Sequence, residues 1–272
     1  MLTHTLPLLK RGLLATVLLA GIATTADAGQ IRISGHTDYR DGTGGEFNVR
    51  GHDAAGAALI ADALTYGYFF APGSQTVGSA NGTKMFVDNV LGFQTFCIEM
   101  TEHIALDGIY DAQISTGALS GGVGGVDPDG AGPLPKTDLI SVGTAYLYSN
   151  FATGQLPTYT YTNGAGRGDD AELLQQAIWY LEDELSLTSS QKAANRFLTN
   201  SVYGALTLFG DGTGVGVGGA KANNTVYNVG VLNLSSSTGG KQDQLINLPD
   251  GGVTSMLLGL ALGGLAVLRR KI

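Results

Sequence analysis

Cysteine, histidine and charge are scarce in this chain of 272 residues. It contains one cysteine, four histidines and one tryptophan, and charged residues make up 14% of it. A lone thiol cannot form an internal disulfide, so stabilisation of the fold by internal disulfides is excluded. The 15 basic residues are outnumbered by 23 acidic ones, which gives a formal net charge of -8. With no basic patch outside the two ends, we expect no nucleic-acid partner.

Glycine, by contrast, is abundant, with 42 residues against 7 prolines. This balance favours short strands and tight turns over long helices. We predict an α+β fold, built as a β-rich sandwich or partial barrel with a helical insertion of three helices. An N-terminal signal helix and a C-terminal transmembrane helix are expected in addition. The domain should occupy residues 29–247, between a signal peptide at 1–28 and a sorting signal at 248–272.

The local pattern divides this domain into elements. A helix is predicted over residues 53–64, and strands over 84–91 and 93–104, joined near Gly92. Further strands are predicted over residues 30–34, 225–234 and 244–248. The three helices of the insertion are predicted over residues 138–151, 171–185 and about 190–202. Asp170 is the expected N-cap of the second.

The N-terminus has the pattern of a cleaved export signal. Lys10 and Arg11 precede an apolar run over residues 13–22, and Ala26 and Ala28 fit the small-x-small rule of signal peptidase. The alternative, an uncleaved anchor, requires a run long enough to span a bilayer, and this one is short. We therefore expect an exported protein.

The C-terminus has a short motif, an uncharged run over residues 253–268 and a basic end. The motif is Leu248, Pro249, Asp250, Gly251 and Gly252, and the basic end includes Arg269 and Arg270. As a helix the run would reach about 24 Å, less than the roughly 30 Å hydrocarbon core, so it spans a membrane only marginally. The basic end should stay in the cytoplasm.

This order of features resembles the PEP-CTERM class of sorting signals, and most closely its Val-Pro-Asp-Ser-Gly variant. Leu248 and Gly251 replace the variant's Val and Ser. The resemblance implies processing by an exosortase, an intramembrane cysteine protease, and a Gram-negative cell envelope, outer surface or extracellular matrix. An ordinary tail anchor is the alternative interpretation.

Cys97 and Gln175 are the candidate reactive residues. Alternation along the predicted strand sets Cys97 and Glu99 on one face and the apolar Phe96 and Ile98 on the other. On the helix, Gln175 lies beside the apolar stripe, at its boundary with solvent.

These residues resemble the thioester domain of bacterial surface adhesins. Phe96-Cys97-Ile98 matches the cysteine motif, and residues 174–179 (LQQAIW) match the Thr-Gln-x-Ala-Ile-Trp pattern except that Leu174 replaces Thr. The resemblance covers roughly residues 66–202. It implies a Cys97–Gln175 thioester that an amine or hydroxyl of a surface protein or polysaccharide opens. The residues expected to surround the bond are Phe96, Ile98, Glu99, Ala177, Ile178 and Trp179.

The roles of the flanking residues stay open. Glu99 either accepts a proton or faces water, and the solvated alternative is preferred. Trp179, Phe96 and Tyr146 would limit water access to the bond, or would simply pack in the core.

Two other functions remain open. A cysteine hydrolase would need a histidine near Cys97, but His103 lies about 20 Å along an extended strand, and His36 and His52 are further away in sequence. We therefore expect no enzyme. We also expect no cofactor and no metal, since the acidic turn at 127–130 lacks the ligand series of a calcium loop. A passive Gly-rich matrix protein with an unreacted thiol is the stronger rival.

Overall fold

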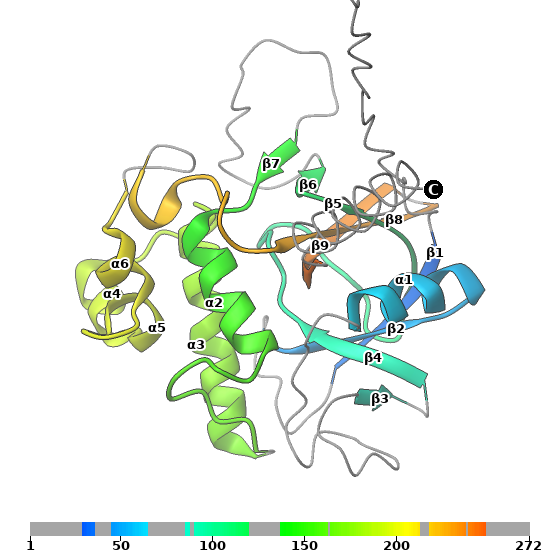
Figure 1. Cartoon of the computed structure of the whole chain (residues 1–272), viewed down its shortest axis with the longest axis horizontal. Coiled ribbons are helices and arrows are strands. Elements are labelled where there is room, and N and C mark those ends of the chain that lie inside the picture. The colour runs from blue at the N-terminus through cyan, green and yellow to red at the C-terminus, as the bar shows by residue number, and fades with distance from the viewer. Residues whose placement is uncertain are drawn as a thin grey trace, which may run out of the picture.

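The computed structural model describes residues 29–35, 45–64, 85–87, 90–119, 137–162, 164–212, 218–237 and 239–248. They form a seven-stranded antiparallel sheet, a two-stranded sheet and a group of helices beside them (Figure 1). The predicted α+β class is confirmed. Neither the signal peptide nor residues 249–272 fall within the described ranges, so the predicted terminal helices lie outside them.

The strands and helices have the following bounds. The large sheet contains β1 (Gly29–Gly35), β2 (Phe47–Gly51), β3 (Met85–Val87), β4 (Val90–Thr95), β5 (Ile109–Ser115), β8 (Val229–Ser236) and β9 (Gly239–Asn247), and the small one β6 (Gly117–Leu119) and β7 (Thr137–Leu139). The helices are α1 (Ala54–Leu64), α2 (Val142–Ala152), α3 (Ala165–Leu181), α4 (Ser189–Ala194), α5 (Arg196–Thr199), α6 (Ala205–Phe209) and the 3₁₀ turn η1 (Gly219–Lys221).

The large sheet curls until β9 meets the chain that leaves β4. The strand order is β3-β4-β2-β1-β5-β8-β9. Beyond β4, the Leu245 N–H donates to the Phe96 carbonyl at 3.1 Å, and the Ile98 N–H donates to the Asp243 carbonyl at 3.0 Å. These bonds flank a bridge between Cys97 and Gln244. Through these contacts, β9 at one end of the strand order also joins the chain that continues β4 near the other end.

Helix α1 packs closely against the sheet at Gly56. The predicted helix at 53–64 is confirmed, with Asp53 Oδ1 accepting from the Gly56 N–H at 2.6 Å and the Gln30 N–H at 3.0 Å. A methyl group at Gly56 would overlap the Gln30 carbonyl oxygen. The helix can approach β1 this closely only because Gly56 has no side chain.

The predicted turn at Gly92 is wrong. Gly92 lies inside β4, where it pairs with Arg50 on one side and Met85 on the other. A side chain there would overlap the Val49 carbonyl oxygen. The glycine therefore serves a close backbone approach within the sheet. The strand also ends earlier than predicted, at Thr95.

The helical insertion differs from the predicted three helices. Its described residues contain five α-helices. The predicted third helix is divided at Asn195, whose side chain accepts from the Phe197 N–H and caps α5, and α6 follows as a further helix. Helix α3 begins at Ala165 after Gly164, so Asp170 is not its N-cap. The Asp170 carboxylate instead accepts from the Thr160 N–H at 2.6 Å and pairs with Arg196.

The core lies between the curled sheet and helices α2 and α3. It includes Phe93 and Phe96 from the sheet side and Phe151, Leu174 and Ile178 from the helices, all at most 2% exposed. Within this core, the Phe96 and Phe151 rings pack edge to face, with their centroids 4.9 Å apart. Among the described residues, no helix has the length and apolar character needed to cross a membrane.

Candidate functional site

Cys97 and Gln175, 78 residues apart in the sequence, are in direct contact. The Gln175 carboxamide accepts through Oε1 from the Cys97 N–H at 3.0 Å. Its Nε2 donates to the Cys97 carbonyl at 2.7 Å. Cys97 is 0% exposed and Gln175 is 1% exposed. The expectation that Gln175 lies at a solvent boundary is therefore wrong.

The closure of the sheet explains why the backbone of Cys97 is available to Gln175. Strand β9 bonds to the neighbours Phe96 and Ile98. Cys97 and Gln244 form the non-hydrogen-bonded pair of this antiparallel bridge, so the N–H and carbonyl of Cys97 point away from β9. Gln175 occupies that opposite edge with a side chain that matches both groups.

The sulfur of Cys97 has a polar neighbour that the sequence pattern did not indicate. Gln244 Nε2 lies 3.1 Å from Cys97 Sγ and also donates to the Gln242 carbonyl at 3.1 Å. Gln244 is 0% exposed. Its position on β9 was predicted as strand, but no local signal pairs it with Cys97, because the contact depends on how the sheet closes.

Glu99 is buried, which contradicts the preferred solvated alternative. It is 2% exposed, its Oε2 accepts from the Asp243 N–H at 3.2 Å, and its carbonyl accepts from Gln242 Nε2. Burial raises the pKa of Glu99 to about 9, and the nearby carboxylates of Asp243 and Glu102 act in the same direction. Glu99 is therefore a neutral acid at neutral pH.

The other predicted neighbours of the site are core residues. Phe96, Ala177 and Ile178 are 0% exposed, Ile98 is 3% and Trp179 is 6% exposed. The Trp179 indole N–H is buried with no hydrogen-bond acceptor within the described part of the chain.

Tyr146 belongs to another aromatic group. Its ring lies 5.6 Å from that of Phe209 and 5.8 Å from that of Tyr227. Burial raises its pKa above the ordinary value.

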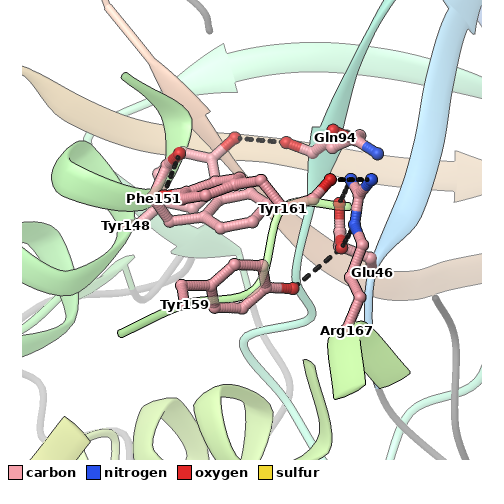
Figure 2. Close-up of polar contacts among 7 residues, drawn as sticks. All are labelled: Glu46, Gln94, Tyr148, Phe151, Tyr159, Tyr161 and Arg167. Carbon is pink, nitrogen blue, oxygen red and sulfur yellow. Dashed lines mark hydrogen bonds and ion pairs between the residues drawn. The ribbon is translucent and has the colours of Figure 1, made fainter. Parts of the chain in front are cut away.

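A buried ion pair fixes the first turns of α3 (Figure 2). Arg167 donates to Glu46 through Nε at 2.7 Å and Nη2 at 2.6 Å, and both side chains are 0% exposed. Nη1 donates to the Tyr161 carbonyl at 2.9 Å, and the Tyr159 hydroxyl donates to Glu46 at 2.8 Å. Glu46 immediately precedes β2, so this network ties α3 to the strand that pairs with β4.

The far end of α3 is held by two carboxylates. Glu182 accepts from the Ser141 hydroxyl at 2.7 Å, and Ser141 in turn caps α2. Burial raises the pKa of Glu182 to about 7. Glu184 accepts from the Met100 N–H at 3.1 Å. Gln175 therefore lies on a helix whose start is anchored beside β2, the strand next to β4, and whose far end is anchored to the chain that follows β4.

Histidine is not part of this site in the residues described. His52 and His103 are exposed, whereas Cys97 is buried, and His36 lies outside the described ranges. The same residues contain no group of three or more His, Cys, Asp or Glu side chains that could hold a metal ion.

Comparison with known proteins identifies the C-terminal signal. A family model described as the VPDSG-CTERM motif matches residues 249–272. No curated protein and no solved structure matches the chain. The motif match supports an exported protein, associated with the cell envelope and processed by an exosortase. Leu248 is the last described residue, so the remaining motif residues lie outside the described ranges, as do Ala26, Ala28, Arg269 and Arg270.

Proposed function

We propose that this protein is an exported surface or biofilm-matrix protein that attaches covalently to a target through a Cys97–Gln175 thioester. The paired hydrogen bonds between the Gln175 carboxamide and the Cys97 backbone, at 3.0 and 2.7 Å, carry this proposal. The exosortase-type motif supports its location outside the cytoplasm. A Gram-negative envelope remains part of the proposal.

The contact supports the chemistry in two ways. The Cys97 N–H donates to Oε1, which polarises the carboxamide and makes its Cδ a better electrophile. The bond from Nε2 to the Cys97 carbonyl fixes the plane of the amide beside the residue that bears the nucleophile. Preorganisation of this kind replaces an entropically costly encounter between sulfur and carbon.

The reaction needs no cofactor or oxidant. Cys97 Sγ forms a bond to Gln175 Cδ, the Cδ–Nε2 bond breaks, and ammonia leaves with the thiol proton. An amine or hydroxyl of the target then attacks Cδ, the Cδ–Sγ bond breaks, and the proton of the nucleophile passes to the thiolate. The product is an amide or ester between Gln175 and the target.

A passive matrix protein is the second candidate. The observation that favours it is the burial of the pair, since Cys97 is 0% and Gln175 is 1% exposed. In this alternative Gln175 serves only to satisfy the Cys97 backbone, and the thiol never reacts.

Intact mass of the full chain, purified in detergent, separates the candidates. A thioester lowers the mass by one ammonia, and methylamine then adds its full mass at Gln175. Cys97→Ala and Gln175→Glu should both abolish the loss of ammonia. Gln176→Glu is the matched control, because Gln176 is the next residue on α3 and contacts the exposed Glu172 instead.

The outcomes are distinct. Loss of ammonia in wild type and Gln176→Glu, but in neither of the other two variants, supports the thioester. An unshifted wild-type mass together with a thiol that can be titrated after unfolding refutes it and favours the passive protein.

A further inference from the structure

Closure of the sheet places Gln244 directly opposite Cys97. Its Nε2 lies 3.1 Å from Sγ, on the face that the two residues share as a non-hydrogen-bonded pair. Both residues are 0% exposed, so water does not compete for the sulfur.

The second contact of Gln244 determines which end of its amide faces the sulfur. Nε2 also donates to the Gln242 carbonyl, at 3.1 Å. A carbonyl is an acceptor only, so a flipped amide would set Oε1 against another oxygen. The N–H donor therefore faces Cys97, and its two hydrogens serve Sγ and the Gln242 carbonyl.

The other end of the amide is left without a partner. Gln244 Oε1 is buried and accepts no hydrogen bond from any residue in the described ranges. An unsatisfied carbonyl costs folding free energy, and an apolar side chain of the same length would avoid that cost. The bond to the Gln242 carbonyl therefore explains one N–H of the amide, and leaves the N–H at Sγ and the buried Oε1 to be explained.

We propose that Gln244 binds the sulfur of Cys97 and stabilises negative charge on it. Its N–H donates to the thiolate that attacks Gln175 Cδ, and donates again to the thiolate that leaves when a nucleophile opens the thioester. The buried Oε1 remains as an acceptor for an N–H of the departing ammonia or the arriving amine. The effect on rates rests on the proposed thioester, whereas the effect on the pKa of the thiol does not.

The first experiment measures the thiol without the thioester. Gln175→Met prevents condensation and keeps the site apolar, and the ultraviolet absorbance of the thiolate then gives the pKa of Cys97 in the full chain. Adding Gln244→Met removes the donor at constant length and should raise this pKa by about one unit or more, since hydrogen bonds to charged groups are the strong ones. Adding Gln244→Glu should raise it further, because a carboxylate repels the thiolate.

The second experiment measures opening of the thioester by methylamine, followed by intact mass. Gln244→Met should slow opening roughly tenfold or more, as loss of one donor to developing charge does elsewhere. Gln94→Leu is the matched control. Gln94 is also a buried glutamine of the sheet, and its amide nitrogen donates no hydrogen bond within the described ranges, to Cys97 or to any other residue. Gln94→Leu should open at the wild-type rate.

Each result bears on one proposal. An unchanged pKa of the thiol in both Gln244 variants overturns the role of Gln244, as does equal slowing in Gln94→Leu and Gln244→Met. A wild-type protein with no loss of ammonia refutes the proposed function alone, and the pKa comparison still tests Gln244. If Gln244→Met does not fold, Gln244→Glu, which preserves the shape of the side chain, provides the comparison.

Discussion

Replacement of Arg167 by methionine should destabilise the protein severely. Arg167 and Glu46 are both 0% exposed, and the substitution removes three donated hydrogen bonds while leaving the Glu46 carboxylate in the core. Breaking a buried pair in this way costs about 3–5 kcal/mol, because the remaining charge is neither solvated nor neutralised. Against a total stability of roughly 5–15 kcal/mol, that is a large fraction.

A double-mutant cycle tests the reasoning. Glu46→Gln in the Arg167→Met background removes the stranded charge while keeping an acceptor for the Tyr159 hydroxyl. The double variant should recover at least half of the lost free energy of unfolding, measured by urea denaturation. Lys192→Met is the control, since the Lys192–Asp211 pair is equally short at 2.7 Å but its side chains are 23% and 44% exposed. That loss should stay at or below about 1 kcal/mol.

Two results would refute this account of the ion pair. If Arg167→Met costs no more than Lys192→Met, the buried pair does not hold α3 in place. If the double variant is as unstable as Arg167→Met, the loss comes from packing of the long side chain rather than from an uncompensated carboxylate.

Three further variants follow from local geometry. Gly56→Ala should destabilise the protein despite the better helix propensity of alanine, because the methyl group overlaps the Gln30 carbonyl. Gly166→Ala, whose added methyl group would have its nearest contact at 3.7 Å, should stabilise the protein by up to about 1 kcal/mol. Shifts of the urea midpoint in the same direction for both variants would refute this. The pKa of Glu99 is raised from 4.5 to about 9, so the folded state holds a proton that the unfolded chain releases, and stability should fall as pH rises through this window. Glu182, with a pKa raised to about 7, is largely deprotonated about one pH unit above that value. From there up to pH 9, Glu99→Gln should flatten the fall in urea midpoint, and an unchanged slope would contradict the assignment.

Local pattern was enough to find several elements and the two residues of the candidate site. The helix at α1 and strands in the regions of β1, β4, β8 and β9 follow from short-range periodicity, which is a property of neighbouring residues. Cys97 and Gln175 could be singled out because a sole cysteine and a short glutamine pattern are visible in the sequence itself. Their contact is in the structure, while the bond between them remains a prediction.

Long-range placement decided what the pattern could not. Asp170 has the residue type of a helix cap, yet its carboxylate pairs with Arg196. Gly92 has the residue type of a turn, yet it lies inside the sheet, where it pairs with Arg50. The burial of Glu99 could not be predicted either, since alternation in a strand separates two faces without saying what covers each.

The sequence by itself identified the C-terminal sorting signal, because that signal is a linear pattern of charge, hydropathy and a short motif that is read along the chain. It also supplied the two residues of the candidate site. Only the tertiary structure decided that β9 closes the sheet beside Cys97, which turns the Cys97 backbone toward Gln175 and brings Gln244 to its sulfur. The physical reason is that closure joins segments 147 residues apart, whose pairing depends on the curl of the whole sheet and not on any local propensity.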